Sequence, residues 1–411
     1  MNHSVGILRY IKENSVLMKL LALNLMAVLS LWSLGAQATR LCEENWSGRS
    51  TYVDYAVPVL ASDMSISAMR DLPVGGVLFR QIIKNPDAAL IGFNNCYKAT
   101  PEGNYAEVTR RFAAEGGLPA VISTWSGHNV YDTGITGIGM VLTFSLYSSG
   151  SVSNLIFPYA EVDEFIGAGS GQGLNSYTVE LLLIKTGDIP AGTWTVPISL
   201  PPLVVDAVLS GDVDAVNGVT KDYGARITVS GAVNVVSGTC QTPDVNVAMG
   251  QHKVSGSSVN TDWVDFTISL LNCPPMHGRY VRTSLVAAQA TNQWLDTGNS
   301  VSGSPDKSNA IGLSLNPVNG YETLLSGGQC AQLTPGANTA SGTCVEIQNA
   351  QGNNVLTDSS MAIVTESGLT PQASAASYQI PLKARYGVIS GSSGMSAGKA
   401  DTAVEFTINY Q

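Results

Sequence analysis

Charged side chains are scarce in this chain, and most of them are acidic. Lys, Arg, Asp and Glu make up 13% of the 411 residues, and the formal net charge is −10 at pH 7. Nucleic acids and anionic lipids attract clusters of Lys and Arg, so this balance disfavours both as partners. Segments with the 3.6-residue apolar period of a helix are also few. Short alternating runs between Gly, Pro, Asn and Asp recur instead, which predicts an all-β protein of the sandwich or barrel type.

The sequence also lacks the residue patterns of common catalytic and metal sites. None of its four histidines stands in HExxH spacing. Gly394-Met-Ser-Ala-Gly398 matches the GxSxG nucleophile motif, but no histidine follows His277 and the expected context is a loop. Asp212-Val-Asp214 resembles the start of a calcium loop whose twelfth position would be Tyr223, where Glu is required. We therefore expect no enzyme activity, no cofactor and no metal site.

Long apolar runs are absent except near the amino terminus. Leu20–Leu34 carries no charge, and a run of about 15 residues is too short to span a bilayer. The small residues of Ala36-Gln-Ala38 follow at the positions that a signal peptidase reads. We expect residues 1–38 to be a secretory signal peptide, with Met18 as an alternative start of translation, and the mature chain to begin at Thr39.

All six cysteines lie beyond this leader, and none has the CxxC spacing typical of zinc sites. An even number of cysteines in an exported chain favours disulfides. Six cysteines allow fifteen pairings. We expect Cys42–Cys96, Cys240–Cys273 and Cys330–Cys344, a set that keeps every bridge inside one half of the chain.

The composition of the sequence changes near residue 220, which predicts two domains. Pro201-Pro202 ends a run of candidate strands, and Asp residues then recur among small residues. We expect one domain over residues 39–220 and a second over residues 225–411. Within them, Pro101–Glu115 is compatible with a helix, and Asp244–Ala248 is expected to be a strand.

The chain ends on an alternating strand that no polar tail covers. Val404, Phe406, Ile408 and Tyr410 alternate with polar residues up to Gln411. This period of two indicates a strand with one buried face. A bare apolar strand at a chain end promotes aggregation unless a partner covers it. We expect this strand to be an assembly element.

Several motifs make the second half resemble the pilin domain of chaperone–usher fimbriae. The motifs are Gly238-Thr-Cys240, Thr242-Pro-Asp-Val-Asn-Val-Ala-Met-Gly250, Leu271-Asn-Cys273, Tyr378-Gln-Ile-Pro-Leu-Lys-Ala-Arg-Tyr386, Gly398 fourteenth from the end and the penultimate Tyr410. The second bridge, Cys330–Cys344, departs from the simplest pilin pattern.

This resemblance implies that the second domain is an incomplete immunoglobulin-like sandwich. Such a domain has an apolar groove beside its last strand, which a periplasmic chaperone and then the next fimbrial subunit fill with a donor strand. Val404, Phe406, Ile408 and Tyr410 would line that groove, and the carboxylate of Gln411 would be held by basic residues of the chaperone.

The first half resembles the amino-terminal domain of two-domain tip adhesins of these fimbriae, also an immunoglobulin-like or β-sandwich fold. Val130–Val141 and Val179–Gly187 carry this resemblance. Ordinary pilins begin with a long alternating arm, whereas here Cys42 follows the expected cleavage site by three residues. A subunit without a donor arm accepts a strand but donates none, so we expect this subunit at the fimbrial tip.

Tip domains of this family usually bind glycans, which need an aromatic face and fixed polar groups. First-half residues of this character in turn-like contexts are Trp46, Tyr52, Asp54, Trp125, His128, Asn129, Tyr131 and Asp132. Trp125–Asp132 is the densest run. The alternative is that Trp125 belongs to the core and the other residues are polar groups of loops.

The sequence thus predicts a fimbrial tip adhesin that attaches a bacterial cell to a host or surface ligand, a glycan or glycoprotein. It would be exported through the periplasm to the cell surface. The expected partners are a periplasmic chaperone, an outer-membrane usher, the next subunit and the ligand. The alternative is a structural tip or adaptor subunit with no ligand site of its own.

Overall fold

The structure is a computed structural model of the whole chain. It describes residues 40–45, 52–59, 65–84, 91–97, 106–148, 151–165, 170–174, 176–211, 213–215, 222–254, 260–290, 293–295, 307–356, 369 and 371–410. The expected leader, residues 1–38, lies outside these ranges. Every regular element within them is a β-strand, so the all-β prediction is confirmed. No helix of the described residues is long and apolar enough to cross a membrane.

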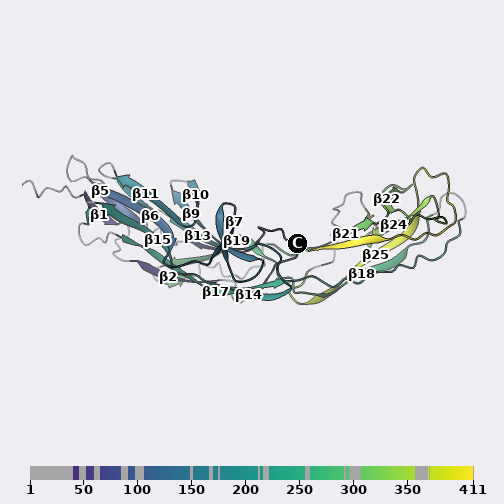
Figure 1. Cartoon of the computed structure of the whole chain (residues 1–411), viewed down its shortest axis with the longest axis horizontal. Helices are drawn as coiled ribbons and strands as arrows, with labels where there is room; N and C mark the ends of the chain where they lie inside the picture. Colours follow the sequence, from purple (N-terminus) through teal and green to yellow (C-terminus); the bar gives the residue numbers. More distant parts are fainter. Residues whose placement is uncertain are drawn as a thin grey trace, which may run out of the picture.

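The strands form two bodies, arranged end to end (Figure 1). The first body contains an eight-stranded sheet with the order β20-β19-β4-β13-β9-β8-β7, and β10 pairs with β9. These strands are β4 (Val77–Lys84), β7 (Val121–Trp125), β8 (His128–Asp132), β9 (Ile138–Ser148), β10 (Ser151–Ile156), β13 (Ser176–Lys185), β19 (Tyr280–Ala290) and β20 (Gln293–Leu295).

A seven-stranded sheet with the order β11-β6-β15-β17-β14 faces the first sheet, and β2 and β3 pair with β17. Its strands are β2 (Val53–Pro58), β3 (Ser65–Ser67), β6 (Ala106–Ala114), β11 (Tyr159–Phe165), β14 (Gly192–Ser199), β15 (Leu203–Gly211) and β17 (Asp222–Ser237). Alternating apolar residues of both sheets form one core. Phe112 of β6 stacks on Phe144 of β9 with 4.5 Å between ring centroids, which joins the two layers.

A small third sheet of the first body has the order β12-β5-β1-β16. Its strands are β1 (Arg40–Asn45), β5 (Ile91–Tyr97), β12 (Ser170–Leu174) and β16 (Val213–Ala215). The register places Cys42 directly opposite Cys96. Their side chains lie outside the described part, so the Cys42–Cys96 bridge stays a prediction.

The second body is a smaller sandwich with a separate core. One layer is a five-stranded sheet, β18-β25-β24-β23-β22, and the other is the pair β21-β26. The strands are β18 (Val264–Cys273), β21 (Ile311–Pro317), β22 (Tyr321–Thr323), β23 (Gln329–Ala331), β24 (Thr343–Asn349), β25 (Ala376–Val388) and β26 (Val404–Tyr410). The predicted bridges Cys240–Cys273 and Cys330–Cys344 are both present.

The first body extends past the boundary expected at residues 220–225. β17 begins at Asp222 and pairs with β14 and β15 along one edge and with β2 and β3 along the other. The chain therefore leaves this sheet after Ser237 and not at residue 220. Pro201-Pro202 does not end the domain, because it only links β14 to β15 within one sheet.

The chain also returns to the first body from beyond the expected boundary. β19, which follows the Cys240–Cys273 region, returns to the first body and pairs in parallel with β4. Arg279 precedes it and donates a hydrogen bond from Nη1 to the carbonyl of Val77 at 2.8 Å. The edge of β4 is therefore covered by a strand from the second half of the sequence.

Two local predictions were wrong. Of the helix expected over Pro101–Glu115, the described part is strand β6, which pairs with β11 on one side and β15 on the other. Sheet pairing on both edges outweighs the weak helical spacing of its apolar residues. The strand expected over Asp244–Ala248 is absent, because that segment has no regular secondary structure and pairs with no strand of the described residues.

Candidate functional site

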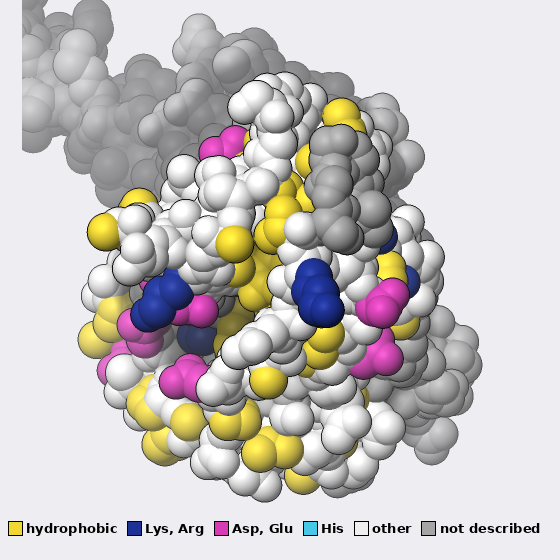
Figure 2. All heavy atoms as spheres, turned by 90° about the vertical axis from the view of Figure 1, so that its right-hand side faces the viewer, with side chains coloured by type: hydrophobic (Ala, Val, Ile, Leu, Met, Phe, Trp, Pro, Cys, Tyr) yellow, Lys and Arg dark blue, Asp and Glu magenta, His cyan; other side chains and the backbone are white. Residues whose placement is uncertain are grey.

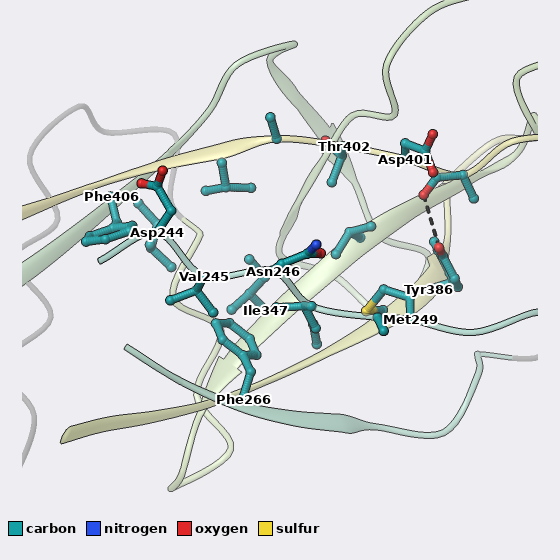
Figure 3. Close-up of a pocket in the computed structure, with 18 of the residues that line it drawn as sticks. Asp244, Val245, Asn246, Met249, Phe266, Ile347, Tyr386, Asp401, Thr402 and Phe406 are labelled. Atoms are coloured by element: carbon teal, nitrogen blue, oxygen red, sulfur yellow. Dashed lines mark hydrogen bonds between the residues drawn. The ribbon is translucent and has the colours of Figure 1, made fainter. Parts of the chain in front are cut away.

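A groove of about 650 Å³ runs along the second body between β26 and the segment Asp244–Gly250. Phe406 lies at one end, and Met249 and Tyr386 lie at the other (Figure 3). Its apolar lining from β18, β21, β24 and β25 comprises Phe266, Ile268, Leu315, Val345, Ile347, Ala384 and Tyr386. Viewed onto its end, the second body shows hydrophobic side chains at the bottom of a hollow (Figure 2).

One wall of the groove is β26, and only one edge of this strand is paired. β21 pairs with it from Ile311 opposite Tyr410 to Pro317 opposite Val404. No other strand of the described residues pairs with it. The main-chain groups of Val404 and Phe406 that face away from β21 are therefore open to a strand placed in the groove.

The residues that lead into β26 are fixed by a close approach to a neighbouring turn. At Gly398 a Cβ atom would lie 2.5 Å from the backbone nitrogen of Ala340 and 2.6 Å from the carbonyl oxygen of Asn338. Only glycine fits such a gap without moving the backbone. Lys399 N–H donates to Asn338 and its carbonyl accepts from Ala340 N–H, which holds the start of this wall.

The opposite wall is Asp244–Gly250, which has the alternation of a strand without a ladder. Val245, Val247 and Met249 are half-buried, whereas Asn246 and Ala248 are exposed. Val245 and Met249 pack against the core of the second body. Neighbouring strands lie about 4.8 Å apart, and each wall offers unpaired main-chain groups. The groove thus has the properties of a binding site for one extended polypeptide segment with alternating apolar side chains.

The far end of β26 is bound by the first body. Arg70 donates from Nη2 to the carbonyl of Ile408 at 2.8 Å, and Tyr410 N–H donates to Oδ2 of Asp71 at 2.8 Å. Arg70 and Asp71 pair with each other, and the guanidinium carbon of Arg70 lies 5.4 Å from the Tyr410 ring centroid. We call these two residues the clasp. Figure 1 marks the carboxyl terminus at this junction between the bodies.

The predicted assembly residues therefore separate into two groups. Val404 and Phe406 line the groove. Ile408 and Tyr410 are buried, with 6% and 2% of their surface exposed, and do not line it. The hydroxyl of Tyr410 accepts a hydrogen bond from Cys240 N–H at 3.2 Å. Gln411 lies outside the described residues.

The clasp is expected to open in acid. Burial alone would raise the pKa of Asp71, but hydrogen bonds from Arg70 and from Tyr410 N–H, with the charges of Arg70 and Lys185, lower that pKa overall. A carboxylate with a lowered pKa stabilises the folded state above its unfolded pKa, about 3.9, and this contribution is lost as the pH falls through the folded pKa. We expect the amide protection factor of Tyr410 to be constant from pH 7 to 5 and to fall below about pH 4. An unchanged factor at pH 2.5 would contradict this.

The structure does not bring the ligand-binding candidates together. Tyr52 and Asp54 lie at β2 in the seven-stranded sheet, whereas Trp125–Asp132 form the β7–β8 hairpin at the edge of the eight-stranded sheet. Trp46 lies outside the described residues. The sequence run Trp125–Asp132 is thus one structural unit, and the other candidates are separate from it.

Tyr52 takes part in an ionic cluster on the sheet face. Its hydroxyl donates to Oδ2 of Asp206 at 2.8 Å, and Arg111 donates from Nε to Oδ1 at 2.7 Å. Asp206 is fully buried. The guanidinium carbon of Arg226 lies 4.1 Å from the Tyr52 ring centroid, and Arg226 lies 3.9 Å from the exposed Asp54. The Tyr52 hydroxyl is therefore engaged with a buried carboxylate.

The β7–β8 hairpin mixes core and surface groups. Trp125 is half-buried and donates from Nε1 to the carbonyl of Gly75 at 2.8 Å. Tyr131 is 3% exposed. Asp132 is exposed and accepts a hydrogen bond from Gly134 N–H, which forms a turn.

Two further residues of the hairpin, Asn129 and His128, have half-buried polar side chains. Asn129 donates from Nδ2 to the carbonyl of Phe157 at 3.4 Å. His128 is half-buried, and its Nδ1 is a buried atom that has no hydrogen-bond partner among the described residues. Beside them Val121 and Ile122 of the edge strand β7 are 54% and 48% exposed. The hairpin thus offers exposed apolar surface next to polar groups.

No sequence pattern indicated the residues of the clasp or Arg111 and Asp206. Arg70 and Asp71 stand in a turn without periodicity, and Arg111 and Asp206 are placed opposite each other by the register of β6 and β15. Among the described residues, no group of three or more His, Cys, Asp or Glu side chains is arranged to hold a metal ion.

Comparison with known proteins gives only distant likenesses. No protein-family model matches the chain, and no curated protein matches it. The CupB6 tip adhesin from Pseudomonas aeruginosa is similar at 17% identity, over 82% of this chain and 88% of that one, with a TM-score of 0.26. The receptor binding domain of the plasmid-born adhesin MrkD1P of Klebsiella pneumoniae is 20% identical over 48% of this chain and 96% of that one, with a TM-score of 0.28.

The P pilus rod subunit PapA is similar at 18% identity, over 42% of this chain and all of that one, with a TM-score of 0.26.

Proposed function

We propose that this chain is a two-domain tip adhesin of a chaperone–usher fimbria. The first body binds a ligand on a host or other surface, and the second body joins the fimbria by accepting a strand from the next subunit. The observation that carries the proposal is the groove of the second body, bounded by β26 and Asp244–Gly250. The pilin-like motifs of the second half supply the identity of the expected partners.

The energetics of the groove favour an extended partner. A strand laid between the two walls would form main-chain hydrogen bonds on both sides, and its alternating side chains would cover Phe266, Ile347 and Phe406. Each large apolar side chain that becomes buried contributes on the order of 1.5–3 kcal/mol. A periplasmic chaperone would fill the groove first, and the next subunit would replace it at the outer-membrane usher.

The groove is tested by placing charge on its wall. We expect Phe406→Asp to lower capture of the chain by a co-expressed periplasmic fimbrial chaperone by at least about 100-fold, because a carboxylate would be buried against apolar lining. Thr407→Asp is the matched control, since the adjacent Thr407 is exposed. Chain that co-purifies with the chaperone is quantified for each variant.

A second pair of variants, on the opposite wall, tests the groove independently in case Phe406→Asp impairs folding. Val245 is half-buried against the core, and the adjacent Asn246 is exposed. Val245→Asp should lose capture, while Asn246→Asp should not. Equal capture of all four variants would reject the groove as the assembly site.

For the first body we propose glycan binding at the β7–β8 hairpin. Half-buried Trp125 and the neighbouring His128 and Asn129 provide an aromatic ring and polar atoms of the kind that sugars require. Affinity at one site would be weak, and many fimbriae on each cell would supply avidity.

Full-length protein on a glycan array tests this site. We expect Trp125→Ala to abolish a specific signal. Trp194→Ala should leave that signal unchanged, because Trp194 lies on β14 in the other sheet. It is a matched control, since it is also half-buried and its Nε1 donates to the carbonyl of Pro190 at 2.8 Å. A signal that survives both changes would move the site away from the hairpin. A folded protein without any signal would favour the alternative, a structural tip or adaptor subunit.

A further inference from the structure

We infer that the clasp sets the register of the partner strand. In this view a strand in the groove pairs with Val404 and Phe406 and stops before Ile408, because Arg70 and Asp71 already bind the rest of that edge. The inference rests on the proposed assembly function of the groove and adds a limit on which strands it accepts.

The clasp and a partner strand would use the same edge of β26. Main-chain groups of alternate residues in a strand point to opposite edges. The carbonyl of Ile408 and the N–H of Tyr410, which are two residues apart, both bind the clasp. Val404 and Phe406 lie in the same alternation, so their main-chain groups face this edge too.

The groove ends where the clasp begins. Its lining follows the chain from Ala400 to Val404 and then Phe406, and on β21 it includes Leu315, the register partner of Phe406. Beyond this point Ile408 is buried in the core of the second body, together with Met69 from the first body. The cavity and the unpaired edge of β26 therefore both end at Phe406.

The clasp is held from several sides. Lys185 donates from Nζ to the carbonyl of Arg70 at 2.5 Å, and its main chain bonds to Gly75 and Gly76 at 2.7 and 2.9 Å. On the other side, the ring of Tyr410 is fixed through its hydroxyl to Cys240 N–H. Hydrogen bonds between main-chain groups and charged side chains are stronger than neutral ones. The clasp is thus positioned by the eight-stranded sheet of the first body.

A longer strand must break the clasp to continue its ladder. The Tyr410 N–H has a single hydrogen to donate, so Asp71 and an incoming carbonyl compete for it. The groove therefore favours a short segment that alternates apolar and polar residues. A segment that runs past Phe406 gains no ladder bonds there without releasing the first body from β26.

The test uses two synthetic peptides and the full-length protein. Both peptides alternate Val and Thr, one over about 7 residues and one over about 12, at a rise of about 3.3 Å per residue. Their dissociation constants are measured for the wild type and for the double variant Arg70→Ala with Asp71→Ala. Arg80→Ala is the control, because Arg80 pairs with Glu180 on the same body at 2.6 Å and has no contact with β26 among the described residues.

In the wild type and in Arg80→Ala, we expect the two peptides to bind equally within about twofold. In the double variant the long peptide should bind roughly tenfold more tightly than the short one, since two main-chain groups become available. Without peptide, the amide of Tyr410 should exchange at least about tenfold faster in the double variant. If the double variant does not fold, Asp71→Asn keeps the size of the side chain and should shift the ratio in the same direction.

The outcomes separate the two proposals. The same long-to-short ratio in the wild type and in the double variant, with both peptides bound, would overturn the register limit and leave the groove as the assembly site. If the long peptide already binds the wild type tenfold more tightly than the short peptide does, the register limit is also overturned and the groove remains the assembly site. Failure of both peptides to bind any variant would reject the groove function, and the register limit with it.

Discussion

A chain that ends at residue 220 is expected to yield no folded first body, whereas one that ends at residue 238 is expected to fold. The shorter chain lacks β17, whose Ile227, Val229, Val233 and Val235 are at most 2% exposed. Burial of a Val or Ile side chain contributes on the order of 1.5–3 kcal/mol, so these four contribute roughly 6–12 kcal/mol. That equals most of the roughly 5–15 kcal/mol that stabilises an ordinary domain.

Thermal unfolding of residues 39–220 and 39–238, followed by circular dichroism, measures this difference. The longer chain should show a cooperative transition and the shorter chain none. A cooperative transition of the shorter chain would mean that β17 is dispensable to the sheet. The longer chain still lacks β19, so it leaves the edge of β4 uncovered, and we expect it to aggregate more readily than the full-length protein.

Loss of the Cys240–Cys273 bridge is expected to destabilise the second body by about 4 kcal/mol. The loss of Cys330–Cys344 should cost about 3 kcal/mol. The bridges span sequence separations of 33 and 14, and the entropy removed from the unfolded chain grows with loop length. For a body of this size, about 4 kcal/mol lowers the melting temperature by roughly 8–16 °C.

Calorimetry of Cys240→Ser and Cys344→Ser without reductant tests the order of these effects. Cys240 is nearly buried, and its N–H bonds to Tyr410, so its replacement should also speed exchange at the end of β26. Cys344→Ser should leave that end unchanged. A Cys240→Ser protein that melts with the wild type would show that this bridge contributes little to stability.

Period-two alternation predicted most of the strands, but not the absence of a strand at Asp244–Ala248 or the sheet to which each strand belongs. The alternation of β17 resembles that of any strand with one buried face, and only its pairing with β2, β14 and β15 places it in the first body. For the same reason the return of β19 to β4 could not be predicted. The two confirmed bridges depended only on spacing along the chain.

The candidate site was predictable where it depended on alternation and not where it depended on contacts. Val404 and Phe406 line the groove. Tyr410 was expected to line it too, but its side chain is buried in the core of the second body, and its N–H bonds to Asp71 of the first body. Such contacts join residues more than three hundred positions apart, and no local pattern encodes them.

The path of the chain between the bodies determines how the protein would carry tension. Only Gly238 and Thr239 separate the end of β17 from bridged Cys240, and β19 also returns to the first body, so β17 and β19 together would carry a pull between the bodies. A load along a strand shears all its ladder bonds together, and β17 is bonded on both edges. The clasp spans the same junction with two hydrogen bonds to β26. Under load the clasp would yield first, and β17 would hold.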